Sequence, residues 1–328
     1  MSPRQVVLFA ANFLTHARPR YNLVMPSSKK SSPRERRRTE LRNRASRNLD
    51  HMSSLAIVRL MNREDRHVGA AIARQLPAIS RAVDGIVDRI RRGGRLLYIG
   101  AGTSGRLGVL DASECPPTFG VSPKLVRALI AGGPRAIQHP VEGAEDNCAQ
   151  AVRDLRKIHF TRNDVLVGLA ASGTTPYVLS AVGYARQKGA LTIGVTANPS
   201  SPLVRAVKIA IAPNVGPEVL TGSTRLKAGT AQKMVLNMLS TASMVRLGHA
   251  YDNLMIDLTR ANKKLKDRAG RILTEASGKE LSAVEHALRQ SEHNLRVALV
   301  MLKRGFSAEL ARKALYEAGG NLRRALAE

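Results

Sequence analysis

Five short apolar runs, separated by longer amphipathic stretches, limit most strongly what this chain can fold into. Each run has the length and the side chains of a buried strand, and together they cover residues 95–99, 125–130, 164–169, 191–195 and 208–211. Strands that alternate with helices in this way indicate an α/β fold, in which helices cover both faces of a parallel sheet. Ligands of such open sheets bind beyond the carboxyl ends of the strands.

Apolar residues at helical spacing occupy the segments around these runs. We expect helices over residues 53–62 and 67–92 before the first strand, and over 143–158 and 176–188 between later strands. A further long helix is expected to follow residue 227 and continue through 247. Its apolar stripe is typical of a core or a subunit contact, and it comprises Leu226, Ala231, Met234, Val235, Met238, Leu239, Ala242 and Val245.

The first strand leads directly into a glycine-rich turn. Residues 100–105 read GAGTSG, with Thr103 and Ser104 between the second and third glycines. A helix opening at such a turn directs backbone N–H groups at an anion, and here two hydroxyls accompany them. We therefore predict that Gly102, Thr103 and Ser104 bind phosphate.

A carboxylate lies further along the helix that this turn opens. We expect the helix to span residues 106–113 and to end near Glu114, because Pro116 and Pro117 cannot continue it. An acid close to a phosphate cradle indicates chemistry on a phosphorylated small molecule.

The three glycines also match the dinucleotide-binding fingerprint G-x-G-x-x-G, a weak signal when taken alone. That fingerprint requires an acid at the end of the second strand to hold a ribose, and residues 131–134 are AGGP. The chain also has no GxxxxGK[ST] sequence, the P-loop signature of nucleotide sites. Neither a nicotinamide cofactor nor a P-loop nucleotide is supported.

Two further turns repeat the hydroxyl-rich pattern. Residues 170–176 (AASGTTP) follow the third strand, and Pro176 is placed to open a helix. Residues 218–227 (EVLTGSTRLK) follow the last strand. Three such turns at one sheet edge suit a sugar phosphate, and they add these candidate binding residues: Ser172, Gly173, Thr174, Ser223, Arg225 and Lys227.

The amino-acid composition limits which classes of partner the chain is expected to bind. The formal charge of +27 is compatible with nucleic acid, but aromatic residues make up only 3% of the chain, which disfavours base-stacking platforms. We expect no specific nucleic-acid function. Two cysteines form no disulfide framework, the eight histidines show no metal-binding spacing, and the apolar run at 6–14 is too short to span a membrane.

The two ends of the chain differ from its middle. Residues 1–38 are polar, basic and proline-containing towards their end, and we expect a disordered extension. Residues 39–270 would form the sugar-phosphate domain with its N-terminal helices. Residues 278–328 are expected to form a small domain of two helix-turn-helix elements, because Asn294-Leu295-Arg296 recurs as Asn321-Leu322-Arg323 at the same offset from an Ala-Leu pair. This domain resembles ubiquitin-associated domains.

Four segments resemble the N-acetylmuramic acid 6-phosphate etherase family: residues 98–120, 141–146 (VEGAED), 170–177 and 221–240. The resemblance covers about nine-tenths of the chain, and its DASECPPT and TRLKAGTAQK segments are highly specific. It implies a sugar-isomerase (SIS) fold and cleavage of the D-lactyl ether of N-acetylmuramate 6-phosphate. The expected products are N-acetylglucosamine 6-phosphate and D-lactate.

The resemblance also assigns residues to the chemistry. It identifies Glu114 as the proton donor and Glu145 as the second catalytic glutamate. The C2 proton of the open-chain sugar is acidic beside the C1 aldehyde, so one base and one acid suffice for elimination and rehydration, with no metal or redox cofactor. An acid that works near pH 7 should be partly desolvated, and we expect this of Glu114. Thr174 stands where the family commonly has arginine.

The resemblance further implies a cytoplasmic homodimer. Two other classes of protein stay open at this point. One is a non-catalytic sugar-phosphate sensor on the same fold that binds a protein partner, although the presence of both Glu114 and Glu145 favours the enzyme. The other is a DNA-binding regulator, which would need a helix-turn-helix module before the sheet that residues 39–92 lack.

Overall fold

A five-stranded parallel sheet forms the centre of the molecule. The computed structural model describes residues 38–258 and 263–327; apart from Arg38, the predicted N-terminal extension lies outside them. The strands are β1 (Leu96–Gly100), β2 (Val126–Ile130), β3 (Val165–Leu169), β4 (Leu191–Val195) and β5 (Ile209–Ile211). Their order is β2-β1-β3-β4-β5, and every neighbouring pair is parallel. All five predicted strands are confirmed to within one residue at either end.

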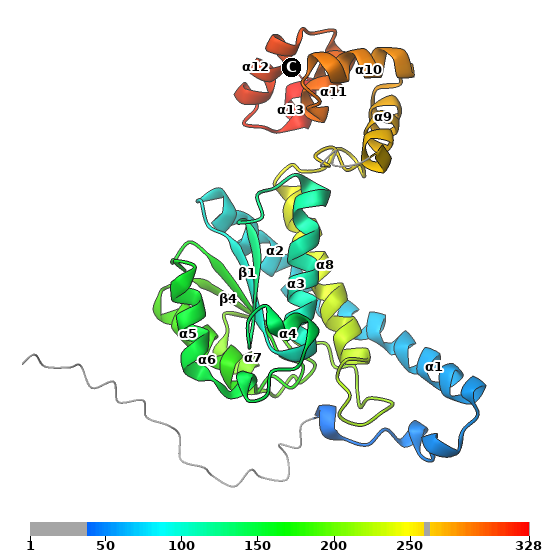
Figure 1. Ribbon diagram of the computed structural model, residues 1–328, viewed down its shortest axis with the longest axis vertical. Helices are drawn as coiled ribbons and strands as arrows, with labels where there is room; N and C mark the ends of the chain where they lie inside the picture. The colour runs from blue at the N-terminus through cyan, green and yellow to red at the C-terminus, as the bar shows by residue number, and fades with distance from the viewer. Residues whose placement is uncertain (1–37, 259–262, 328) are drawn as a thin grey trace, which may run out of the picture. The chain divides into compact units, whose positions relative to one another are not determined.

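Helices cover both faces of this sheet (Figure 1). One face packs against α1 (Ser54–Ala73), α2 (Leu76–Arg91), α3 (Gly102–Phe119) and α8 (Lys227–Arg246). The other packs against α5 (Cys148–Lys157), α6 (Pro176–Gln187) and α7 (Pro202–Ala206). Two short elements, α4 (Arg135–Gln138) and the 3₁₀ turn η5 (Ala144–Asp146), follow β2, and the 3₁₀ turns η2 (Arg38–Glu40), η3 (Arg44–Ser46) and η4 (Leu49–His51) precede α1.

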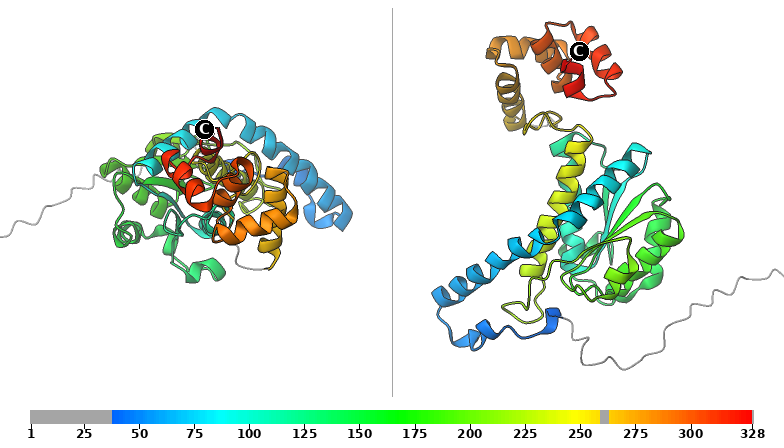
Figure 2. Two further views of the ribbon diagram at one scale, coloured as in Figure 1. Left: turned by 90° about the horizontal axis from the view of Figure 1, so that it is seen from above. Right: turned by 180° about the vertical axis from the view of Figure 1, so that it is seen from behind.

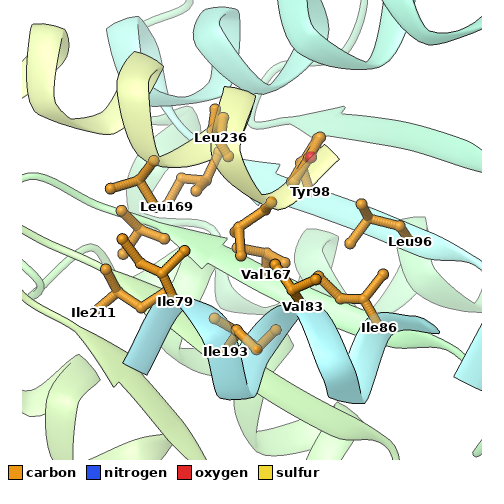
Figure 3. Packing of buried hydrophobic residues seen from close by; sticks show 14 of the residues in the cluster. Ile79, Val83, Ile86, Leu96, Tyr98, Val167, Leu169, Ile193, Ile211 and Leu236 are labelled. Carbon is orange, nitrogen blue, oxygen red and sulfur yellow. The ribbon is translucent and has the colours of Figure 1, made fainter. Parts of the chain in front are cut away.

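Alternate side chains of each strand serve different cores. Leu96 and Tyr98 of β1 point to the α2–α8 face, whereas Leu97 and Ile99 point to the α5–α6 face. Figure 3 shows the first of these cores, where Ile79, Val83 and Ile86 of α2 meet residues from four strands. All four β1 side chains are fully buried, as expected of a strand with helices on both sides.

The helical region before β1 differs from the prediction. A break was expected at residues 63–66, but α1 runs through them and the chain turns at Arg74–Gln75 instead. Pro77 explains the position of the break, because its ring prevents α1 from continuing into α2 and favours the first turn of a new helix. The Gln75 side chain accepts a hydrogen bond from the Ala212 N–H at 3.0 Å, which joins this turn to the end of β5.

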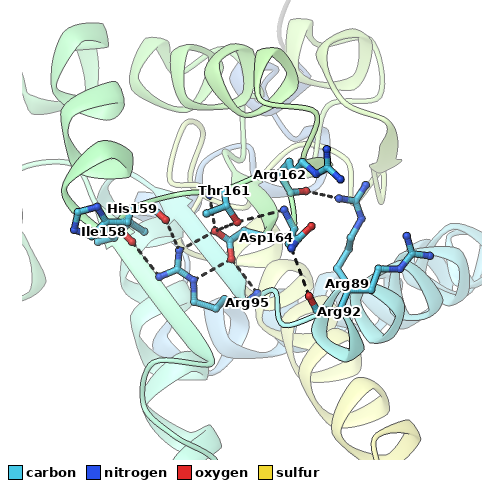
Figure 4. A network of polar contacts seen from close by, with 9 residues as sticks. Arg89, Arg92, Arg95, Ile158, His159, Thr161, Arg162 and Asp164 are labelled. Atoms are coloured by element: carbon cyan, nitrogen blue, oxygen red, sulfur yellow. Dashed lines mark hydrogen bonds and ion pairs between the residues drawn. The ribbon is translucent and has the colours of Figure 1, made fainter.

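An ion pair holds the amino edge of the sheet together (Figure 4). Arg95 precedes β1 and its guanidinium lies 2.8 Å from the carboxylate of Asp164, which precedes β3 and is 2% exposed. The same guanidinium donates to the carbonyls of Ile158 and His159. Burial disfavours ionisation of Asp164, but the hydrogen bonds from Arg95 and Thr161 outweigh it and lower the pKa of this carboxyl.

The C-terminal helices form a separate hydrophobic core. They are α9 (Lys263–Ser277), α10 (Leu281–Gln290), α11 (Leu295–Arg304), α12 (Ala308–Glu317) and α13 (Leu322–Ala327). Asn294 caps α11 and Asn321 caps α13, each through its side-chain oxygen, so the sequence repeat marks two equivalent helix starts. Ala269 and Leu273 of α9 pack in this core, so a boundary at residue 270 would divide a helix that belongs with the C-terminal region. No helix in the described part of the chain is long and apolar enough to cross a bilayer.

Candidate active site

The order of the strands places two of the predicted turns side by side. From β1 the chain crosses to β2 at one edge, and from β3 it crosses to β4 in the opposite direction. Gly100 at the end of β1 is in register with Leu169 at the end of β3. The turns that follow these two residues therefore lie side by side at the carboxyl edge of the sheet. This is the position of the crevice in which open α/β sheets bind their ligands.

The first turn exposes helix amides to this crevice. Helix α3 begins at Gly102, which has a φ of 50°, and the residue before it, Ala101, has no side chain that can cap the helix. A Cβ added at Gly105 would lie 2.9 Å from the Gly100 carbonyl oxygen, so only glycine lets α3 start this close to β1. Because the first amides of a helix lack intrahelical acceptors, this turn suits an anion.

The second turn brings two hydroxyls together. The hydroxyls of Ser172 and Thr174 lie 2.9 Å apart, and both residues are half-buried. Gly173 between them has a φ of 69°, and a Cβ there would lie 2.1 Å from Ser201 Oγ, so the turn fits tightly against its neighbour. Helix α6 then begins at Pro176, as predicted, and presents a second helix N-terminus beside the first.

The Ser104 side chain makes a contact that the sequence did not predict. Its side chain is 8% exposed, and its hydroxyl donates to Gln232 Oε1 of α8 at 2.8 Å. Gln232 in turn donates to the Val195 carbonyl at the end of β4. The Ser104 hydroxyl proton therefore ties the first turn to α8, which leaves the Ser104 backbone amide and the half-buried Thr103 as candidates for phosphate.

In the third turn, Lys227 cannot be the binding residue that the sequence predicted. Ser223 is half-buried and Arg225 is exposed, so both remain candidates for binding. Lys227, however, is 2% exposed, and its ammonium lies 2.7 Å from Glu64 of α1. We correct the prediction that Lys227 is a binding residue: it is the buried partner of an ion pair.

Helix α3 is longer than the sequence predicted. It passes through Pro116 and Pro117 and ends at Phe119, and Gly120 closes it in the left-handed conformation with a φ of 63°. Glu114 therefore lies within the last turns of a helix and not beyond its end. It is also exposed in the single chain, contrary to the expected desolvation.

The two glutamates lie far apart within one chain. Glu114 is twelve residues after Gly102, which corresponds to about 18 Å along α3 and directs it towards the amino edge of the sheet. Glu145 lies in the 3₁₀ turn η5 after β2, on the carboxyl side, and is exposed. The predicted helix over 143–158 is interrupted here, because Asn147 caps a separate α5.

A buried polar cluster holds the segment of α3 that carries Glu114. The carboxylate of Asp111, one turn earlier, accepts hydrogen bonds from Tyr98 Oη at 2.8 Å and Ser240 Oγ at 3.1 Å. Burial raises the pKa of Asp111, although both hydrogen bonds oppose this effect. Burial also raises the pKa of the Cys115 thiol to about 12, so Cys115 stays protonated and is no nucleophile.

Among the described residues, no three histidine, cysteine, aspartate or glutamate side chains gather where they could hold a metal ion.

Comparison with known proteins is consistent with this geometry. Residues 78–186 match the N-terminal SIS domain of glucokinase regulatory protein, and residues 149–242 match the SIS domain. N-acetylmuramic acid 6-phosphate etherases of Yersinia pestis and Yersinia pseudotuberculosis are 55% identical to the chain over 288 residues, which cover 88% of this chain and 98% of theirs. The chain belongs to the N-acetylmuramic acid 6-phosphate etherase family. Its fold is that of the SIS domain, as the sequence predicted.

Solved structures resemble the chain more distantly. A phosphoheptose isomerase from Francisella tularensis aligns with a TM-score of 0.42 at 17% identity, covering 59% of this chain and all of that one. The Vibrio vulnificus NanR protein complexed with ManNAc-6P aligns with a TM-score of 0.39 at 15% identity, covering 68% and 69%.

Proposed function

We propose that the chain is an N-acetylmuramic acid 6-phosphate etherase, a carbon–oxygen lyase that releases D-lactate from N-acetylmuramate 6-phosphate. The observation that carries the proposal is the pair of adjacent helix N-termini at the ends of β1 and β3, lined by Thr103, Ser172 and Thr174. A phosphate dianion is stabilised by such dipoles and donors. The relatives that share over half of the sequence carry this activity in their names.

The reaction requires only proton transfers from the protein's side chains. A base removes the C2 proton of the open-chain sugar, the C3–O bond breaks, and an acid protonates the departing lactate oxygen. Water then adds to C3 of the unsaturated aldehyde, loses a proton to the carboxylate that served as the acid, and C2 is reprotonated. We assign the acid and the later base for water to Glu114. Glu145 would act at C2 or in ring opening.

A second subunit would resolve the separation of the two glutamates. We propose a homodimer in which Glu114 of one subunit completes the crevice of the other. Leu110, 48% exposed, lies one turn before Glu114 on the same side of α3, as expected for a contact surface. On the same face of the domain, α2 and α8 lie side by side (Figure 2). They border an apolar groove of about 860 Å³ that includes the half-exposed Leu76 and Val245.

We also propose that the protein works in the cytoplasm, where a phosphorylated sugar is retained, and that it binds neither specific nucleic acid nor membrane. The alternative of a non-catalytic sensor predicts sugar-phosphate binding without turnover. Lactate release therefore separates the two functions.

The position of an ¹⁸O label taken up from water tests the mechanism. The protein is incubated with N-acetylmuramate 6-phosphate in ¹⁸O-water. Elimination followed by hydration places the label on the C3 hydroxyl of N-acetylglucosamine 6-phosphate and leaves the lactate hydroxyl unlabelled. Label on the lactate hydroxyl would contradict C3–O cleavage, and the absence of lactate would contradict the function itself.

A further inference from the structure

Both ends of the third turn are fastened by buried groups that the reaction itself does not use. The carboxylate of Glu218, 1% exposed, accepts the Lys227 N–H at 3.0 Å and the Ala228 N–H at 2.9 Å. A single side chain thus links the start of the turn to its end. It also occupies the amides at the N-terminus of α8, so this helix, unlike α3 and α6, has its first donors already satisfied.

A second set of contacts fastens the same two ends to α1. Glu64 of α1 accepts hydrogen bonds from Lys227 Nζ and from Asn43 Nδ2, each at 2.7 Å. Asn43 Nδ2 also lies 3.2 Å from the Pro217 carbonyl oxygen, which it reaches as a donor. Burial disfavours ionisation of Glu64, but the donors from Lys227 and Asn43 outweigh it and lower the pKa of the carboxyl.

What these four residues enclose is a short loop. Four residues fix both ends of the segment 219–226: Asn43, Glu64, Glu218 and Lys227. We call these four residues the clasp. The loop carries the half-buried Ser223 near its middle. Arg225, two residues before Lys227, is an exposed cation for which a carboxylate is the natural ligand. A long cation on a loop recognises a ligand well only if the loop is held in place, because otherwise ordering the loop opposes binding.

We infer that the clasp is a positioning device that fixes the 219–226 loop so that Arg225 and Ser223 recognise the lactyl carboxylate of the substrate. The inference rests on the proposed function and deepens it. The clasp residues do not touch the substrate; they set discrimination between the lactyl-bearing substrate and the product, which lacks that carboxylate. The two turns that hold the phosphate are built separately, on β1 and β3.

The test compares two ligands that differ in the lactyl group. Glu64→Gln/Lys227→Met removes both charges of the buried pair together, which avoids leaving one of them unpaired. In a Glu114→Gln background, where turnover is blocked, calorimetry measures Kd for N-acetylmuramate 6-phosphate and for N-acetylglucosamine 6-phosphate. We expect substrate binding to weaken by about tenfold or more, while binding of the product changes by less than about twofold.

The matched control removes a different ion pair of the domain. Arg95→Met/Asp164→Asn acts at the amino edge of the sheet (Figure 4) and should change neither Kd. If the clasp double variant does not fold, as judged by circular dichroism and thermal unfolding, Asn43→Ala releases only the Pro217 end and should shift substrate Kd in the same direction.

Two outcomes would contradict the proposed positioning role of the clasp. Equal weakening for both ligands would show that the four residues support the whole crevice, and unchanged substrate binding would show that they serve the fold alone. The proposed function is tested separately by lactate release from the unaltered protein. If no lactate is released, the proposed function is wrong, whatever the ratio of the two Kd values.

Discussion

At the scale of single residues, two sets of acidic side chains in the domain have contrasting surroundings. Glu114 and Glu145 are exposed. Asp111, Asp164 and Glu218 are at most 9% exposed, and each accepts at least two hydrogen bonds. The buried carboxylates are committed to the fold, whereas the exposed ones are free to exchange protons with a substrate.

Removing the proposed acid should abolish most turnover. We expect Glu114→Gln to lower kcat for lactate release by about 10²–10⁴-fold, the usual worth of one general acid or base. Glu142→Gln, an exposed glutamate near Glu145, is the control and should retain the kcat of the unaltered protein. A Glu114→Gln variant of full activity would remove this residue from the mechanism.

The pair of Arg95 and Asp164 predicts a specific response to acid. The pKa of Asp164 is lowered in the folded state, so its contribution to stability is complete above its unfolded value near 3.8 and is lost as pH falls through the folded value. We expect Asp164→Asn to be less stable than the unaltered protein by about 3 kcal/mol at pH 7. In urea unfolding this difference should shrink below pH 4, and a difference that stays constant with pH would contradict the assignment.

At the scale of helices and strands, the sequence pattern predicts most of the architecture and misses a few ends. Buried runs of apolar residues located every strand, because burial on both faces leaves few other options for such segments. The end of α3 was misplaced because prolines disfavour a helix without forbidding it in its last turns. The burial of Lys227 could not be foreseen, since its partner Glu64 is 163 residues away.

Gly120 at the end of α3 offers a test of how that helix is terminated. Its φ is 63°, and an added Cβ would lie 2.4 Å from the Asp257 carbonyl oxygen. Gly120→Ala should therefore lower the free energy of unfolding by more than the ~1–2 kcal/mol of left-handed strain alone. Gly133 has a φ of 69°, but a Cβ added there would meet open space. Gly133→Ala therefore measures the strain without the clash. Equal losses in chemical denaturation would contradict the close contact.

The first turn should be equally sensitive to a methyl group. Gly105→Ala would bring a Cβ within 2.7 Å of Ile130 and 2.9 Å of the Gly100 carbonyl oxygen. We expect this change to displace α3 from β1 and to weaken N-acetylglucosamine 6-phosphate binding, measured by calorimetry. Gly69→Ala, in the middle of α1 with open space around it, should instead stabilise the protein by about 0.5–1 kcal/mol. Unchanged product binding in Gly105→Ala would separate this turn from the phosphate.

At the scale of the whole molecule, one chain contains every part of the proposed site but does not assemble it. The two turns proposed to bind phosphate border the carboxyl edge of the sheet, and α3 carries Glu114 about 18 Å away along its axis. The sequence motifs predicted both parts, but motif spacing along the chain does not report which ends of an element face one another. A symmetric dimer is the commonest way for proteins to bring such separated surfaces together.

Mixing two inactive variants tests this account most directly. Glu114→Gln lacks the acid, and Ser172→Ala/Thr174→Ala lacks the hydroxyls of the second turn. If Glu114 of one subunit completes the crevice of the other, a mixed dimer contains one site with both defects and one intact site. Random reassortment makes half of the dimers mixed, so lactate release should recover to about one quarter of the unaltered rate. A mixture that stays as inactive as its two components would contradict a site shared between subunits.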